Sequence, residues 1–193
     1  MAYFLVGEGV GSGVIECGNL LLGVQGAASE IGHISVDVQG PRCECGNYGC
    51  LELFCSAPAM LKMAHERVPE CFTNTYEKSY DACNAVFEAA RSVNPKALEV
   101  VREIAEYIGY GCVTLINAYN PDIIVIGDSV SQGGDLLLPI IQDVVNQRTI
   151  SELRAKVQIK ITSLQVDPTL YGAAAVATDM VLQMPSAFLA VRE

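Results

Sequence analysis

Hydrophobic positions at the start of the chain form short runs separated by glycine-rich breaks. Residues 2–6 are apolar and run into Gly-Glu-Gly-Val-Gly-Ser-Gly, and the apolar segment 14–23 is interrupted by Gly18 and Asn19. Short apolar runs between glycines are typical of strands, and a turn pair inside such a run indicates a hairpin. The pattern predicts a strand at 2–6, a hairpin turning at Gly18–Asn19, and another strand at 34–38.

From Ser56 onward the spacing of apolar residues becomes helical. Ser56 is suited to cap a helix and Pro58 to stand in its first turn, so a helix is expected to run to about Val68. Residues 69–79 are predicted as a loop. A second helix is expected at about 80–92.

A long helix is predicted to begin at Pro95. Apolar residues recur in it at three- and four-residue spacing, which places one apolar stripe on a single helix face. We interpret it as a central packing helix whose stripe serves the core or an interface. The stripe consists of Leu98, Val101, Ala105, Ile108, Cys112 and Leu115.

The last third of the chain alternates strand and helix patterns. Residues 120–127 form a continuous apolar run between Asn-Pro and glycine, as expected for a strand buried on both faces. A helix at 133–147, a strand at 157–163 and a small-residue helix at 171–183 follow. This alternation predicts the α/β class, with no internal repeat or linker.

Composition and charge narrow the functional classes. The chain has 193 residues, of which 51% are hydrophobic and 18% charged, and its formal net charge is −10. This charge disfavours direct binding to DNA or to an anionic membrane, so a nucleic-acid contact would need another domain. No apolar window predicts a membrane span, and eight cysteines without a signal peptide indicate a reducing, cytoplasmic compartment.

One loop concentrates the chemistry. Cys43, Cys45 and Cys50 follow His33 by ten, twelve and seventeen residues, and three thiolates with one imidazole are a ligand set for a closed tetrahedral zinc site. The alternative, that these cysteines are small buried hydrophobes, stays open, although the surrounding Gly, Pro, Arg, Glu and Asn are poor core material. A redox pair is a further alternative that the pattern favours less. His65 is interpreted as a surface or boundary residue. Core packing is the preferred interpretation for Cys17, Cys55, Cys71, Cys83 and Cys112.

Beyond its ligand pattern, the segment 29–52 resembles a family motif. Its Glu-x-Gly-His, its C-x-C-G-x-x-G-C and the Glu that follows resemble the ROK family of repressors, open reading frames and sugar kinases, closest to the repressor branch. The resemblance implies the C-terminal lobe of an actin-like, ribonuclease H-like sugar kinase fold with a mixed sheet flanked by helices. Residues 1–193 would be that single lobe, without the N-terminal lobe or any DNA-binding domain.

The resemblance also assigns roles to residues of this loop. His33, Cys43, Cys45 and Cys50 would hold a structural zinc ion, and Glu30, His33 and Glu52 would face the hydroxyls of a bound sugar. Carboxylates and a fixed imidazole are suitable partners for such hydroxyls. The plainer alternatives are that Glu30 caps a helix end and that Glu52 is a solvated surface charge.

Two further segments decide between a kinase and a sensor. The loop with Gly7, Glu8, Gly9 and Gly11 stands where the family's kinases have G-T-G-x-G-x-G. Gly127 and Asp128 stand in the adenosine loop, where the kinases have three glycines. Both segments therefore place a carboxylate beside the nucleotide position, where, if poorly solvated, it would repel a polyphosphate. On glycine spacing alone, a plain turn between two strands explains the first loop equally well.

No catalytic residue is expected in this chain, because the family's catalytic Asp belongs to the smaller lobe. These features favour the sugar-sensing lobe of a transcriptional regulator, a homodimer that contacts DNA only through a missing domain. The alternatives are a fragment of an ATP-dependent sugar kinase, of the glucokinase or N-acetylhexosamine kinase type, and an open lobe that binds nothing alone.

Overall fold

The computed structural model describes residues 1–73, 75–154, 156–164 and 168–184. The chain divides into two compact units, residues 1–162 and 163–193. Among the described residues of the second unit, one helix is found, α7 (Pro168–Gln183), at the position predicted for the small-residue helix. None of the described helices is both long and apolar enough to cross a lipid bilayer.

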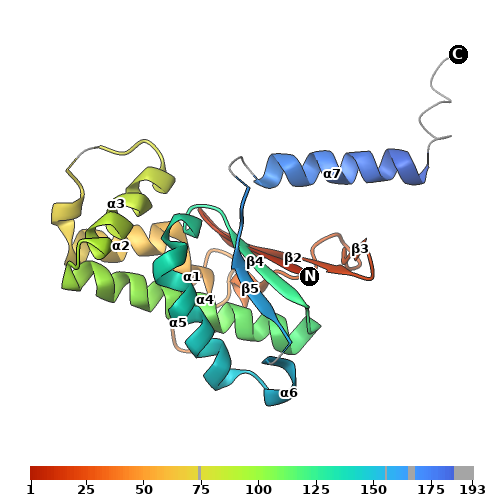
Figure 1. Cartoon of the computed structure of the whole chain (residues 1–193), viewed down its shortest axis with the longest axis horizontal. Helices are drawn as coiled ribbons and strands as arrows, with labels where there is room; N and C mark the ends of the chain where they lie inside the picture. The colour runs from red at the N-terminus through yellow and green to blue at the C-terminus, as the bar shows by residue number, and fades with distance from the viewer. Residues whose placement is uncertain (74, 155, 165–167, 185–193) are drawn as a thin grey trace, which may run out of the picture. The chain divides into compact units, whose positions relative to one another are not determined.

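A mixed five-stranded sheet forms the centre of the first unit (Figure 1). The strand order is β3-β2-β1-β4-β5, in which β1 pairs with β2 antiparallel and with β4 parallel, and β4 pairs with β5 parallel. The predicted strands at 2–6, 120–127 and 157–163 are therefore confirmed. The strands are β1 (Ala2–Val6), β2 (Val10–Glu16), β3 (Asn19–Leu20), β4 (Ile123–Gly127) and β5 (Gln158–Ile161).

The hairpin is confirmed, but its turn lies one residue earlier than predicted. Glu16 pairs with Asn19, so the two turn residues are Cys17 and Gly18, with φ of 50° and 81°. Two consecutive residues of positive φ match the twist of the flanking strands, as in type I′ turns. A cysteine thus stands where sequence rules favour Asn or Gly, and Asn19 begins the returning strand.

The predicted strand at 34–38 is wrong. Ser35 makes one isolated bridge, to Cys50, and the amides of Val36 and Asp37 both donate to the Gly49 carbonyl, at 2.8 and 3.4 Å. Val38 is 81% exposed. The cysteine loop itself provides the hydrogen-bond partners of this segment, so its alternating apolar residues do not join the sheet.

The helices follow the predicted order, with two additional short α-helices, α1 and α6. Ser56 caps α2 as expected, because its hydroxyl accepts the Ala59 amide at 3.3 Å. A short helix, η2, lies in the predicted loop 69–79, of which residue 74 is outside the described part. The described helices of the first unit are α1 (Glu52–Cys55), α2 (Ala57–Arg67), α3 (Ser79–Arg91), α4 (Pro95–Tyr119), α5 (Gly134–Arg148), α6 (Ser151–Arg154), η1 (Ile31–His33), η2 (Pro69–Cys71) and η3 (Ser131–Gly133).

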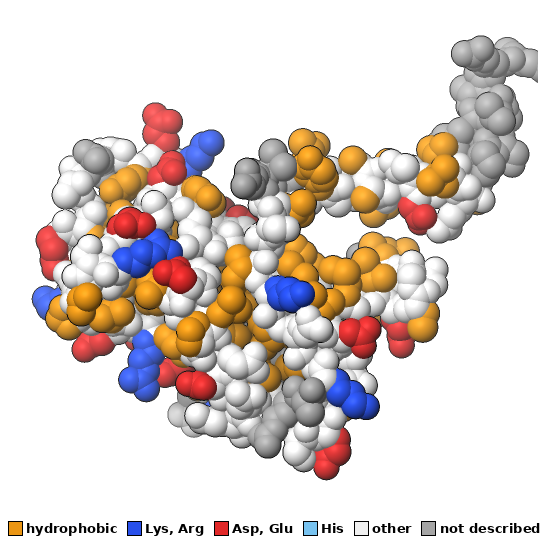
Figure 2. Space-filling view, in the orientation of Figure 1, with side chains coloured by type: hydrophobic (Ala, Val, Ile, Leu, Met, Phe, Trp, Pro, Cys, Tyr) orange, Lys and Arg blue, Asp and Glu red, His pale blue; other side chains and the backbone are white. Residues whose placement is uncertain are grey.

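Helix α4 is the central packing helix that its periodicity predicts. Five of the six stripe residues are buried, whereas Leu98 is 37% exposed and does not belong to the buried face. The helices cover one face of the sheet, so Ile124 and Ile126 of β4 are buried but Ile123 and Val125 are only half-buried. The prediction that this strand is buried on both faces is therefore wrong for the first unit. Figure 2 shows hydrophobic side chains at the surface over the sheet.

Most cysteines outside the loop pack as predicted. Cys55, Cys83 and Cys112 are buried, and burial raises the pKa of each thiol, that of Cys83 to about 12. Cys17 is exposed in the hairpin turn, so the core interpretation is wrong for it, and Cys71 is only half-buried. His65 is exposed, as predicted, and stacks on Phe72 with ring centroids 3.9 Å apart.

Candidate metal centre

The four predicted metal ligands lie together. One ligand atom from each of His33, Cys43, Cys45 and Cys50 falls within 4.8 Å of the others. The sulfurs of Cys45 and Cys50 are 3.6 Å apart, and Cys43 Sγ is 3.8 Å from His33 Nδ1. Zinc–sulfur bonds of about 2.3 Å place two sulfurs of a tetrahedral site about 3.8 Å apart. The donor set and its spacing therefore fit a closed, structural metal site.

The exposure of Cys45 argues against a purely hydrophobic role for the three cysteines. Cys43 and Cys50 are buried, but Cys45 is exposed. Burial and the two neighbouring thiols raise the pKa of Cys50 to about 12, whereas the Asn47 backbone amide lowers the pKa of Cys45. A bound cation would take the place of the Cys50 proton, because the thiolate is the ligand form.

The backbone of the loop positions the sulfurs. The Cys43 amide donates to the Asn47 carbonyl at 2.8 Å, and the Gly46 amide donates to the Cys43 carbonyl at 3.0 Å. Gly46 and Gly49 have φ of 96° and 60°, a backbone conformation that is unfavourable for residues with a Cβ. The tight turns at these two glycines bring Cys45 and Cys50 to the same point.

Asn47 is a site residue that sequence reasoning missed. Its side-chain amide donates to the His33 carbonyl at 2.9 Å and approaches Cys50 Sγ at 3.5 Å. It thus connects the histidine turn to the cysteine loop, and partners of this kind orient metal ligands. The available signal was an amide side chain inside a glycine-rich cysteine loop.

The backbone of Val10 anchors both parts of the predicted sugar motif. Gly32 lies against the Val10 carbonyl, so closely that a Cβ would collide with this oxygen. Glu52 Oε2 accepts the Val10 amide at 2.9 Å. The glutamate is therefore held by β2 and is not a freely solvated surface charge.

Glu30 differs from Glu52 in its surroundings. It is exposed at the start of η1, and its side chain makes no capping hydrogen bond there. Its backbone carbonyl accepts the His33 amide at 3.2 Å. The plain capping interpretation is therefore not supported for its carboxylate.

The two predicted nucleotide segments meet at the first glycine loop. The loop is Gly7–Gly9, because Gly11 already belongs to β2. The Asp128 carboxylate lies directly over Gly7, with Oδ1 2.9 Å from the position a Cβ would take. Asp128 has a φ of 77°, and Ser129 Oγ donates to its Oδ1 at 3.0 Å.

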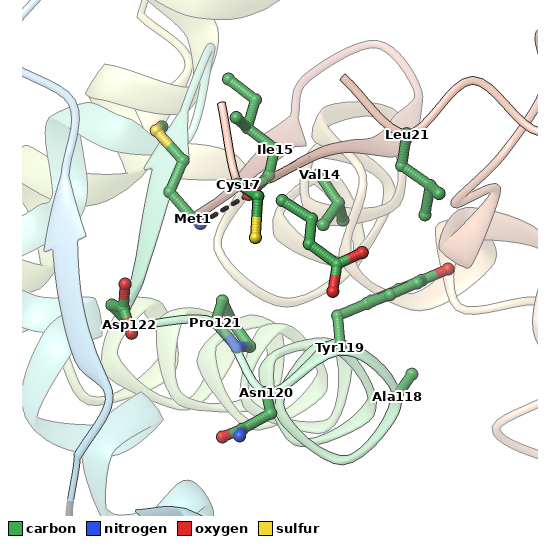
Figure 3. Close-up of a pocket in the computed structure, with 11 residues that line it drawn as sticks. Met1, Val14, Ile15, Cys17, Leu21, Ala118, Tyr119, Asn120, Pro121 and Asp122 are labelled. Atoms are coloured by element: carbon green, nitrogen blue, oxygen red, sulfur yellow. Dashed lines mark hydrogen bonds between the residues drawn. The ribbon is translucent and has the colours of Figure 1, made fainter. Parts of the chain in front are cut away.

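A cavity of about 340 Å³ lies elsewhere in the first unit (Figure 3). The hairpin and the end of α4 enclose it, and the Met1 amino group donates to the Ile15 carbonyl at its edge, at 2.9 Å. None of the predicted sugar, nucleotide or metal residues lines it. Its lining is Met1, Val14, Ile15, Glu16, Cys17, Leu21, Ala118, Tyr119, Asn120, Pro121 and Asp122.

Comparison with known proteins identifies the family. The model of the ROK family matches residues 1–180. The chain belongs to the ROK family. It is 38% identical to the glucokinase of Halalkalibacterium halodurans, over 89% of this chain and 54% of that protein. It is 30% identical to the DNA-binding transcriptional repressor Mlc of Escherichia coli, over 91% of this chain and 43% of that protein.

Solved ROK structures share the fold. A ROK family transcriptional regulator homologous to E. coli Mlc superposes with a TM-score of 0.72 at 29% identity, covering 83% of this chain and 41% of that one. A Streptomyces griseus ROK glucokinase in complex with glucose and AMPPNP gives 0.70 at 29% identity, covering 83% and 54%. The mixed sheet with flanking helices is thus the actin-like fold of ROK kinases and regulators, and the chain spans about half the length of the curated relatives it matches.

Proposed function

We propose that this chain is the effector-sensing lobe of a ROK transcriptional regulator. It binds a sugar through Glu30, His33 and Glu52, beside a structural zinc ion held by His33 and the three loop cysteines. Residues 1–193 form one lobe of a cytoplasmic homodimer. DNA contact belongs to a domain outside this chain, in keeping with its net charge of −10.

The arrangement of the first glycine loop carries this proposal. Asp128 packs its carboxylate against Gly7, and Glu8 adds an exposed second carboxylate on the loop itself. A nucleotide phosphate placed beside these two carboxylates would be repelled, at a cost of several kcal/mol in binding free energy. A lobe built in this way favours sugar binding without nucleotide binding.

The contacts of Glu52 and His33 support a sugar site. Glu52 Oε2 is fixed by the Val10 amide, and no partner for Oε1 is found among the described residues. In His33, Nδ1 is the ring nitrogen near Cys43 Sγ, so Nε2 is the nitrogen available for a sugar hydroxyl. A metal on Nδ1 would fix the imidazole in the orientation and tautomer that such a contact needs.

A specific observation favours a second candidate, a fragment of a ROK sugar kinase. The identity to the H. halodurans glucokinase is 38%, above the 30% to the repressor Mlc. In this alternative, the missing part of the protein would supply the catalytic base. The gene sequence preceding Met1 separates the two candidates: a helix-turn-helix supports the regulator, and a D-x-G-x-T motif supports the kinase.

Sugar binding is tested with the full-length protein by thermal shift against glucose, N-acetylglucosamine and xylose. At a hundredfold excess over its dissociation constant, a bound sugar adds about 2.7 kcal/mol to the free energy of unfolding. We expect Glu52→Gln to weaken sugar binding by roughly tenfold or more, because a charge-assisted hydrogen bond is lost. Glu44→Gln, in the same loop, is the matched control and keeps wild-type affinity. Equal affinity of both variants, at unchanged metal content, would contradict the sugar site.

The nucleotide side gives a separate prediction. We expect MgATP binding to the wild-type protein to be too weak to detect by calorimetry. The Glu8→Thr, Asp128→Gly double variant is expected to bind MgATP at least about tenfold more tightly than the wild type does. Glycine also suits the positive φ at position 128, so the variant is expected to fold. Tight MgATP binding by the wild type, with ADP release that depends on a hexose, would establish the kinase instead.

A further inference from the structure

The metal ligands differ in their access to solvent. Cys45 is exposed, whereas Cys43 is 4% exposed and Cys50 is fully buried. A reagent in solution therefore meets the Cys45 sulfur first. The Cys50 sulfur lies 3.6 Å from it, within reach for a second bond.

The loop is built so that these two sulfurs can join. A disulfide needs a separation of about 2.0 Å, so the sulfurs must approach by about 1.6 Å. Gly46 lies between the two cysteines, and no atom within 4 Å of its Cβ position would obstruct that movement. Cys43 Sγ lies 3.8 Å from His33 Nδ1 and is the competing thiol of the cluster.

We propose that Cys45 and Cys50 form a reversible redox pair through which a hydroperoxide releases the metal. The Cys45 thiolate attacks one oxygen of the peroxide, the O–O bond breaks, and Cys45 becomes a sulfenic acid. The other oxygen leaves, takes up a proton and is released as an alcohol or water. The Cys50 sulfur then attacks the sulfenic sulfur, and the hydroxyl leaves as water. The two sulfurs together lose two electrons, which the peroxide accepts.

The disulfide removes two of the four donors at once. Only His33 and Cys43 remain, and two protein ligands do not hold a structural zinc ion. Glu52 follows Cys50 by two residues and bonds the Val10 amide, so loss of the metal reaches the proposed sugar carboxylate through a short segment. The inference therefore rests on the metal site of the proposed function and adds its regulation by oxidants; a dithiol reductant restores the site.

The test uses the full chain, purified under reducing conditions and loaded with zinc. Metal content is measured first, so failure of the metal site is recognised before any oxidant is added. Hydrogen peroxide is then titrated while a chromogenic chelator reports free zinc and peptide mapping reports disulfides. We expect one equivalent of zinc to be released together with a 45–50 peptide lighter by two hydrogens, and a dithiol to reverse both changes.

Two variants make the result decisive. Cys45→His keeps four possible donors without the exposed thiol, and it is expected to retain zinc at peroxide doses that empty the wild type. Cys17→Ser, which removes an exposed cysteine outside the cluster, is expected to behave as the wild type. The proposal is overturned if Cys45→His loses zinc as fast as the wild type. It is also overturned if the released wild type carries a bridge to Cys43, or a sulfinic acid without any disulfide.

Discussion

Replacement of Cys50 by serine is expected to abolish stoichiometric zinc binding and to give one of the two largest losses of stability among the variants considered. Zinc at about a thousandfold excess over its dissociation constant stabilises the folded state by about 4 kcal/mol. For a chain of this size, that loss lowers the melting temperature by roughly 10 °C. The reason is geometric, since Cys50 is fully buried and its sulfur lies 3.6 Å from Cys45 Sγ and 3.5 Å from the Asn47 amide.

Calorimetry with zinc, metal analysis and thermal melting in the presence and absence of a chelator measure this effect. The chelator should lower the melting temperature of the wild type to that of Cys50→Ser and leave the variant almost unchanged. Cys17→Ser serves as the control, because this cysteine is exposed in the β2–β3 turn. A wild-type protein that melts at the same temperature with and without the chelator would contradict a structural metal.

Substitution of Gly49 by alanine is expected to produce the other large effect. Gly49 has a φ of 60°, and a Cβ added to it would collide with the Asp37 carbonyl oxygen. Backbone on both sides fixes this contact, since the Gly49 amide donates to the Pro41 carbonyl at 2.8 Å. We expect a loss of more than about 3 kcal/mol and a loss of zinc binding, because the loop must open to accommodate the methyl group.

Gly46 provides a matched comparison in the same loop. Its φ is 96°, but a Cβ at this position would meet no atom within 4 Å. Gly46→Ala therefore carries only the backbone strain, about 1–3 kcal/mol, and should still bind zinc. Denaturant unfolding and zinc titration of the two variants separate these contributions. Equal losses in both variants would show that conformation alone, and not the contact with Asp37, determines the requirement for glycine.

The predictions from the sequence succeeded where local spacing carries the physical cause. The stripe on α4 follows from the helical period, and the cap at Ser56 follows from the need of a helix end for an acceptor. The same holds for the clustering of His33 with the three loop cysteines, which their short spacing favours; that they bind a metal stays a prediction. In each case, the residues concerned are close together along the chain.

The predictions failed where contacts outside the element, and not the spacing within it, decide the outcome. Residues 34–38 have the alternation of a strand, but the carbonyl of Gly49 takes their amides. Leu98 has the correct spacing for the α4 stripe, yet it lies near the beginning of the helix and is partly exposed. Local periodicity predicts which face of an element is apolar, and it does not specify whether another element covers that face.

The sequence by itself determined most of the strand and helix order, the cluster of four candidate metal ligands and the family motif, because each depends on residue type and on short spacing. Only the tertiary structure decided that Val10 holds both Gly32 and Glu52, that Asn47 bridges the histidine turn and the cysteine loop, and that Asp128 covers Gly7. The physical reason is that Val10 is 42 residues from Glu52 in the chain, and Gly7 is still farther from Asp128. Contacts of this kind arise from packing of the whole sheet and its helices, which no local pattern encodes.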